Sequence, residues 1–298
     1  MTKCLVTRFN GVCSNESLPI LGHFRIKVLK DISPETSSIN ITVLKDTTAT
    51  IIGNGYFTDS TFTSNEGNVL SLSSEGQNKF YVKAVEDCYV DIADKDAIKQ
   101  FVSLQKNSGF DLADLKYSKV IYLWAPGSQV YGDIKNIENL NLTCLRLDNT
   151  AVTGDISVLK NLTGLTTLSL DNTAVTGDIS VLKNLTGLTN QGLIFHSKNK
   201  LYGNLGDLPD SLLYLFGSKN GNDFTWTSSD RTKILALTGI ECSTIDDLLN
   251  GMKDLTAEFG GSQIWYKSIS LYGTRTSASD AAVATLQSKG YTVLITPA

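Results

Sequence analysis

The middle of the chain contains the same twenty-residue segment twice. Residues 147–166 and residues 170–189 both read LDNTAVTGDISVLKNLTGLT, so the two copies are offset by 23 residues. A single unit of this length cannot bury its apolar side alone, whereas stacked units merge their apolar sides into one core. The duplication therefore predicts a solenoid of stacked coils.

The apolar residues of one copy follow a fixed spacing. The spacing is L-x-x-L-x-L-x-x-N-x-L-x-G-x-I, with Thr in the position of the Asn. This pattern resembles that of the leucine-rich-repeat family, whose period is about 20–29 residues. Leu168 and Leu170 are expected to point inward from a short strand that pairs in parallel with the strand of the next coil. The clearest unit contains Leu165, Leu168, Leu170, Thr173, Val175, Gly177, Ile179, Leu182 and Leu185.

Two polar positions recur in each unit. Thr150 and Thr173 occupy the position of the repeat Asn, where a side chain bonds the backbone of adjacent turns, so we expect their hydroxyls to form a structural ladder. Asp133, Asp155 and Asp178 follow the repeat glycine and form a regular column of carboxylates. A calcium ladder is one interpretation of this column, and capping of backbone turns is the favoured one.

The outward strand positions carry the candidate binding residues. Trp124 beside Tyr122 and Arg146 has the composition of a binding hot spot. The alternative is that Tyr122 and Trp124, which belong to the first coil, pack against the neighbouring β module or its cap helix. The candidates on the concave face are Tyr122, Trp124, Arg146, Thr167 and Ser169.

The N-terminal part of the chain has a different pattern. Residues 1–92 contain alternating runs such as 24–28 and 39–43 with Asn-Gly turns between strands, and they predict a β-sandwich-like attachment module. Residues 93–298 are expected to form the solenoid, and apolar residues at helical spacing predict a cap helix over 94–102. The expected divisions of the solenoid are an N-terminal cap at 93–114, repeats at 115–230 and strand-helix-strand C-terminal coils at 231–298.

The last coils are expected to carry true helices. Residues 244–255 and 277–289 have helical patterns between strand-like runs, and Gly290 follows the second at the position of a left-handed C-terminal residue. The expected fold class is therefore α+β and multi-domain. It consists of an N-terminal all-β sandwich-like module followed by a leucine-rich-repeat solenoid with a parallel sheet and helical C-terminal coils.

Composition sets further bounds. The chain has 298 residues, of which 41% are hydrophobic and 19% are charged, and this suits one or two globular units. Since no apolar run approaches 18 residues, we expect no membrane insertion. A formal net charge of −4 gives no basic footprint for nucleic acid. The five cysteines are scattered and indicate reduced thiols, although pairing of Cys4 with Cys13 across a hairpin stays open.

The sequence contains no motif for catalysis or cofactor binding. His23 and His196, the two histidines, lie in different predicted modules, and no Cys or His spacing fits a metal site. Neither a phosphate loop nor a nucleophile elbow is present. We therefore expect a protein that is not an enzyme and has no catalytic residues, no metal and no cofactor.

A second resemblance covers the N-terminal module. Residues 15–26 read NESLPILGHFRI and are followed by a threonine-rich β module that contains Phe57-Thr58-Asp59-Ser60. This sequence resembles the N-terminal module of fibre-type virion proteins of crAss-like tailed phages. The resemblance implies a structural head or tail fibre or decoration protein, assembled in the host cytoplasm, whose module attaches to the virion.

The same resemblance implies a set of partners. These are virion capsid or tail proteins at the β module, a host surface protein or glycan at the repeats, and further copies of the chain in a homo-oligomer. The alternative is a bacterial leucine-rich-repeat adhesin or a cytosolic protein-interaction scaffold that uses the same solenoid.

Overall fold

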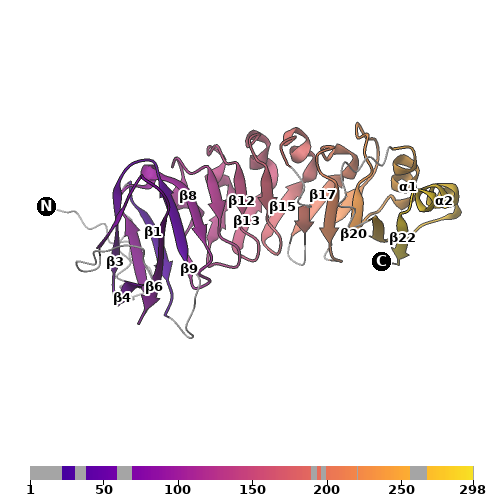
Figure 1. The fold of residues 1–298 in the computed structure, drawn as a ribbon. Coiled ribbons are helices and arrows are strands. Elements are labelled where there is room, and N and C mark those ends of the chain that lie inside the picture. The colour runs from indigo at the N-terminus through magenta and orange to yellow at the C-terminus, as the bar shows by residue number, and fades with distance from the viewer. Residues whose placement is uncertain are drawn as a thin grey trace, which may run out of the picture.

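The computed structural model is elongated, with strands stacked side by side along its length (Figure 1). The two-layered β module lies at the N-terminal end, and the helices α1 and α2 lie at the C-terminal end. The structure describes residues 22–30, 38–58, 69–188, 193–195, 199–219, 221–255 and 267–297, and the side chains of Thr58 and of 193–195 are not described.

The N-terminal module consists of two facing antiparallel sheets. One has the strand order β5-β3-β7-β1-β9, and the other begins with β4-β6-β2-β8. Side chains alternate along each strand, so that Ile39, Ile41 and Val43 are buried while Asn40 and Thr42 are half-buried. The strands are β1 (Phe24–Val28), β2 (Ile39–Val43), β3 (Thr47–Ile52), β4 (Gly55–Thr58), β5 (Val69–Leu72), β6 (Asn78–Ala84) and β7 (Cys88–Ile92).

The cap of the solenoid is a strand, and the predicted helix over 94–102 is wrong. After the short 3-10 segment η1 (Lys95–Ala97) comes β8 (Ile98–Ser103). This strand pairs antiparallel with β2 on one side and parallel with β10 (Tyr122–Trp124) on the other. Because both neighbours bond its backbone, pairing overrides the helical spacing of its apolar residues. The β module therefore covers the open end of the solenoid.

The two sheets of the module continue into the two sides of the solenoid. The strand β9 (Ser108–Gly109) pairs antiparallel with β1, and Asp111 just after it bridges in parallel to Tyr131 of the next coil. Between the sheets, the rings of Phe24, Phe101 and Phe110 meet edge to face with centroids 4.8–5.6 Å apart. All three rings are buried. This cluster joins the module to the first coil through apolar packing.

Each repeat coil contributes one strand to each side of the solenoid. The strands β10, β12 (Cys144–Arg146) and β14 (Thr167–Ser169) pair in parallel on one side. The predicted inward leucines Leu168 and Leu170 are buried. The second sheet contains β11 (Tyr131–Asp133), β13 (Ala151–Asp155), β15 (Ala174–Asp178), β17 (Lys200–Asn204) and β19 (Asp223–Thr225).

The fold is mostly β, so the predicted α+β class is wrong. Among the residues that the structure describes, strands make up 41% and helices, 3-10 segments included, 20%. The predicted helical C-terminal coils are also wrong, because a parallel five-stranded sheet carries this end and its two α-helices have nine residues each. The elements of this end are β16 (Leu193–Phe195), β18 (Tyr214–Gly217), β20 (Ala236–Glu241), α1 (Ile245–Lys253), β21 (Ser268–Tyr272), η7 (Ser277–Ser279), α2 (Asp280–Ser288) and β22 (Thr292–Thr296).

The physical reason for this difference lies in the connecting segments. Most coils cross between their two sheets through a short 3-10 segment, whereas the coil between the paired strands β21 and β22 carries α2. The apolar residues that repeat in these segments are buried, as in Ile156 and Leu159. The segments are η2 (Leu112–Leu115), η3 (Ile134–Ile137), η4 (Ile156–Asn161), η5 (Ile179–Asn184) and η6 (Leu205–Asp207).

The column of repeat carboxylates caps these segments, as the favoured interpretation predicted. Asp155 Oδ1 accepts a hydrogen bond of 2.7 Å from the Ser157 backbone N–H, two residues further on. This bond satisfies a backbone donor that the first turn of a helix leaves unpaired. Equivalent bonds are made by Asp111, Asp133 and Asp178.

The repeat glycine of one coil lies against the capping carboxylate of the preceding coil. Gly154 has φ = 104°, and a Cβ atom built on it would lie 2.3 Å from Asp133 Oδ1. Only glycine tolerates both the left-handed backbone and this close approach. The same arrangement recurs at Gly132, Gly177 and Gly203.

The predicted ladder threonines are buried and bond mainly within their own coils. Thr150 and Thr173 each donate a hydrogen bond of 2.6 Å to the carbonyl three residues earlier, at Leu147 and Leu170. The bond between coils comes from Asn199, whose Nδ2 donates to the Leu170 carbonyl and to the Thr173 hydroxyl at 3.0 and 3.1 Å. The ladder therefore needs the longer asparagine side chain to reach the neighbouring coil.

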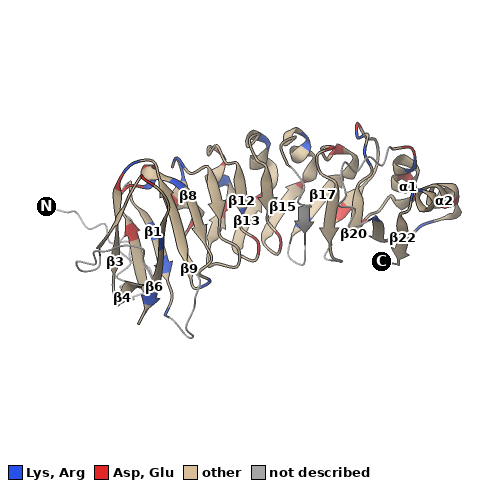
Figure 2. Ribbon diagram, in the orientation of Figure 1, with Lys and Arg blue, Asp and Glu red and all other residues tan. Residues whose placement is uncertain are grey.

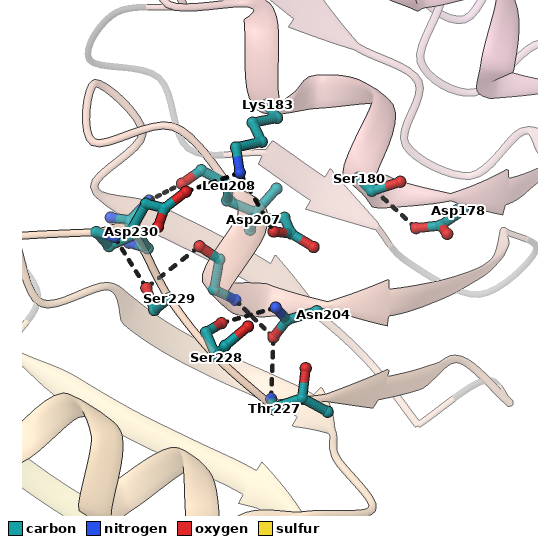
Figure 3. Close-up of polar contacts among 12 residues, drawn as sticks. Asp178, Ser180, Lys183, Asn204, Asp207, Leu208, Thr227, Ser228, Ser229 and Asp230 are labelled. Carbon is teal, nitrogen blue, oxygen red and sulfur yellow. Dashed lines mark hydrogen bonds and ion pairs between the residues drawn. The ribbon is translucent and has the colours of Figure 1, made fainter.

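The regular stacking changes after η5, where Asn204 takes the place of the capping aspartate (Figure 3). Its Oδ1 accepts from the backbone N–H groups of Gly206 and Thr227, and its Nδ2 donates to the Ser228 carbonyl. An amide can donate as well as accept, so Asn204 bonds the next coil directly, whereas a carboxylate could only accept. On the same side, Lys183 forms ion pairs with Asp207 and Asp230 (Figure 3).

The close approach of glycine to carboxylate gives a test of the stacking. The substitution Gly154→Ala is expected to destabilise the protein by roughly 1–3 kcal/mol, because it strains the backbone and displaces the Asp133 cap. Gly164→Ala is the matched control, since its Cβ would lie 3.6 Å from the nearest atom, the Leu142 carbonyl oxygen. Thermal unfolding followed by circular dichroism measures both variants. Equal melting temperatures for the two would contradict the proposed role of the glycine.

Candidate functional site

One line of side chains runs across the joined sheet from the β module into the repeats. Lys79 of β6 lies opposite Asn40 of β2, which lies opposite Val102 of β8. Val102 in turn lies opposite Trp124 of β10, and Trp124 lies opposite Arg146 of β12. Their sequence neighbours Phe80, Ile41, Phe101, Leu123 and Leu145 are buried, so the line is on the solvent side of the sheet. We call Lys79, Asn40, Val102, Tyr122, Trp124 and Arg146 the junction face.

The aromatic residues of the junction face hold one another in place. The rings of Tyr122 and Trp124 are stacked, with centroids 6.1 Å apart and planes 7° from parallel. The Arg146 guanidinium lies over the Trp124 ring, 4.5 Å from its centroid. A cation over an indole is attracted by the negative face of the ring. Three of the five predicted binding residues therefore form one cluster.

The side chain of Arg146 is also held by Asp148, in the turn that follows β12. Its Nε donates a hydrogen bond of 2.9 Å to Asp148 Oδ1. Within the described part of the chain, this is the only hydrogen bond that the Arg146 side chain makes, so the terminal nitrogens point to no protein acceptor. The guanidinium is thus oriented by Trp124 and Asp148 with its terminal N–H groups available.

The polar groups beside the cluster favour their neutral forms. Burial is the main cause that raises the pKa of the Tyr122 hydroxyl, and the neighbouring Cys144 thiol raises it further. Burial also raises the pKa of the Cys144 thiol. Cys144 is buried at an outward position between Tyr122 and Thr167, as the register of β10, β12 and β14 shows. The charged groups of this cluster are therefore the Arg146 guanidinium and the Asp148 carboxylate with which it forms an ion pair.

The remaining predicted residues lie further along the same sheet. Thr167 and Ser169 are half-buried on β14, and Ser169 lies opposite Arg146. The alternative was that Tyr122 and Trp124 pack against the β module or its cap helix, and the cap helix is wrong because residues 98–103 form a strand. Trp124 instead has Val102 of that strand as its neighbour across the ladder.

Sequence reasoning missed Lys79, Asn40 and Val102, because it assigned the strand that links them to a helix. It also missed a second aromatic pair in the repeats. Tyr214 and Phe216 of β18 stack with centroids 6.4 Å apart and planes 14° from parallel. The signal was present, since Tyr214-Leu215-Phe216 repeats the pattern of Tyr122-Leu123-Trp124 in the same strand position.

Charged groups gather mainly at the turns of the repeat region, and its strands carry few of them (Figure 2). In the β module, Asp91 is buried and accepts from His23 Nδ1 at 2.6 Å and from Arg25 at 3.2 Å. No hydroxyl or thiol among the described residues bonds His23. A base without an adjacent nucleophile does not form a catalytic pair.

His196 lies outside the described residues, as do Cys4 and Cys13, whose pairing stays open, and most of the stretch 15–26. Among the residues that the structure describes, no group of three His, Cys, Asp or Glu side chains could hold a metal ion. No helix in these parts of the chain is long and apolar enough to cross a bilayer.

Comparison with known proteins gives no family assignment. No protein-family model matches the chain, and no curated protein matches it. Among solved structures, a plant peptide hormone receptor, RGFR1, in complex with RGF2, is similar over 64% of this chain and 34% of that chain, with 22% sequence identity and a TM-score of 0.35. The chain thus spans about a third of the length of that receptor chain. The register of the strands shows that the repeat region is a solenoid of stacked coils paired in parallel.

One carboxyl beside the junction carries a pH-dependent contribution to stability. Burial raises the pKa of Asp114 in η2 from 3.8 to about 6; the nearby Asp111 raises it further and Arg25 lowers it. Because the folded state favours the protonated form, the contribution is full below pH 3.8 and is lost as the pH rises to about 6.

Asp114→Asn is therefore expected to raise the melting temperature at pH 7 and to leave it unchanged at pH 4. The gain is on the order of 1 kcal/mol, because solvent screens this half-buried carboxyl. Thermal unfolding at several pH values measures it. Asp223→Asn, an exposed carboxyl on β19, is the control for the change of charge. A gain that does not depend on pH would contradict the assignment.

Proposed function

We propose that this chain is a binding protein and not an enzyme, and that its junction face contacts a protein partner. The observation that carries the proposal is the cluster of Tyr122, Trp124 and Arg146 on the solvent side of the sheet. Tryptophan, tyrosine and arginine are the residues that most often dominate the energy of protein interfaces. A partner would bury all three together.

The setting of the cluster supports this proposal. The strand β10 is bonded by β8 on one side and by β12 on the other, so the backbone beneath Tyr122 and Trp124 is held on both sides. The side chains are held in turn by stacking and by the Arg146–Asp148 bond. Groups that are already ordered lose less entropy when a partner binds. The surface is therefore preorganised for recognition.

The more specific function that we propose is that of a phage virion protein, either a fibre or a decoration protein. This rests on the resemblance of residues 15–26 and of the β module to fibre-type virion proteins. The module would attach to a capsid or tail protein, and the repeats would present the binding surface outward, with several copies in one assembly. The chain would then be localised in the virion. A bacterial adhesin or a cytosolic scaffold is the competing assignment.

The test is capture by the full chain, immobilised in wild-type form and as Trp124→Ala. The two samples offered are disassembled virion proteins of a crAss-like phage and a surface extract of its bacterial host. Loss of Trp124 is expected to weaken capture of a protein partner by about thirtyfold, the effect of removing a hot spot of roughly 2 kcal/mol. Tyr202→Ala on β17, which is exposed on the other sheet, is the control and should retain the partner.

The outcomes separate the alternatives. A Trp124-dependent partner from the virion sample supports both levels of the proposal. A Trp124-dependent partner from the bacterial surface alone supports binding through the face and contradicts attachment to the virion by this face. Capture that is unaffected by Trp124→Ala but lost with Tyr202→Ala would move the binding site to the second sheet.

A further inference from the structure

We propose that the junction face recognises an extended acidic polypeptide segment, with one carboxylate at Arg146 and a second at Lys79. This inference rests on the proposed function and names the partner chemistry of the same face. Four features of the face support it: the orientation of Arg146, the position of Lys79, the neutral residues between them, and the covered face of Trp124.

The first feature is the unused capacity of Arg146. Its Nε bond to Asp148 and its position over Trp124 fix the plane of the guanidinium. The side chain of Arg146 has about a third of its surface exposed, at 32%, whereas that of Asp148 has 13%. A carboxylate can accept two parallel hydrogen bonds from the terminal nitrogens of an arginine held in this way. Asp148 is half-buried and forms an ion pair with Arg146 through Nε, so the bond leaves the terminal guanidinium nitrogens for an incoming acid.

The second feature is Lys79, which is exposed and lies in the same register line as Arg146. Four strand-to-strand steps separate the two residues, through Asn40, Val102 and Trp124. At about 4.8 Å per step, the separation is roughly 19 Å. An extended chain rises about 3.3 Å per residue, so acidic side chains about six residues apart would reach both cations.

The third feature is the absence of a competing charge in this line. The chain has a net charge of −4, yet the residues between Lys79 and Arg146 in the register are neutral. A neutral amide, an apolar side chain and an aromatic ring fill the interval, so an acidic segment meets no carboxylate there. Asn40 in this interval can also donate and accept hydrogen bonds with a peptide backbone. Lys79 and Arg146 therefore favour an anionic partner at this face, although the chain as a whole is acidic.

The fourth feature favours a polypeptide over an acidic glycan. A sugar ring binds to tryptophan by stacking on an open face of the indole. One face of Trp124 already carries the Arg146 guanidinium, and the Tyr122 ring stacks parallel to Trp124. What the cluster offers is guanidinium N–H groups and ring edges, which suit a carboxylate on a flexible side chain.

The test uses labelled peptides with the full chain and measures fluorescence anisotropy. The main probe carries two glutamates with five neutral residues between them, and its controls carry two adjacent glutamates or two glutamines. The spaced peptide is expected to bind at least tenfold more tightly than the glutamine peptide, and more weakly as salt is added. Arg146→Gln is expected to lower the affinity about tenfold. Lys79→Gln is expected to lower it about threefold.

The control variant is Lys200→Gln, which makes the same change of charge on the exposed side of β17 in the second sheet. Its affinity should equal that of the wild type, and equal melting temperatures for all three variants exclude unfolding as the cause. An affinity that does not change in Arg146→Gln, or that does not depend on the spacing of the glutamates, would overturn the inference. An oligogalacturonate of the same charge that binds more tightly than the peptide would overturn the choice of a polypeptide.

Failure of this inference is distinguishable from failure of the proposed function. A protein partner whose capture depends on Trp124 but not on Arg146, Lys79 or salt would retain the function and overturn the acidic segment. Capture that depends on neither Trp124 nor Arg146 would contradict both the proposed function and the acidic segment.

Discussion

The regular coils of the solenoid stack closely because the repeat glycine leaves room for a carboxylate of the preceding coil. That carboxylate caps the 3-10 segment of its own coil, as Asp155 does for the N–H group of Ser157. The glycine of the next coil, Gly177, packs against it with φ = 126°, where a Cβ atom would lie 2.8 Å from Asp155 Oδ1. The Thr-Gly-Asp sequence is thus a local cap and a contact between coils at once. After Gly203, Asn204 replaces the aspartate and bonds the next coil through its amide.

The β module and the solenoid are joined by a strand that belongs to both. Pairing of β8 with β2 and with β10 converts the antiparallel sheet of the module into the parallel sheet of the repeats. The Phe24, Phe101 and Phe110 cluster packs beneath this change of direction. A solenoid needs a covered end, and a paired strand covers it with no unsatisfied backbone groups on that side. The arrangement also places side chains from the two parts on one surface, and that surface is the junction face.

The sequence was sufficient where structure depends on neighbours in the chain or on the exact repeat. The inward leucines, the capping role of Asp155 and Asp178, and the outward Tyr122 and Trp124 all follow from the 23-residue period. It was insufficient where pairing partners are distant, because strand pairing is set by tertiary context. The apolar side chains of residues 98–103 have a spacing that suits a helix, yet these residues form a strand that pairs with β2 and β10. That error left Lys79 and Asn40 out of the predicted site. The α+β class was wrong because most coils cross through 3-10 segments, and the C-terminal α-helices α1 and α2 are short.

The central claim is that the module and the repeats share one sheet with Asn40 opposite Val102. A pair of cysteines introduced as Asn40→Cys and Val102→Cys tests it directly, because residues opposite each other on neighbouring strands lie within reach of a disulfide. Mild oxidation of the full chain followed by peptide mass spectrometry should find these two positions linked within one molecule. Two thiols that remain free under the same oxidation would contradict the shared sheet and with it the junction face.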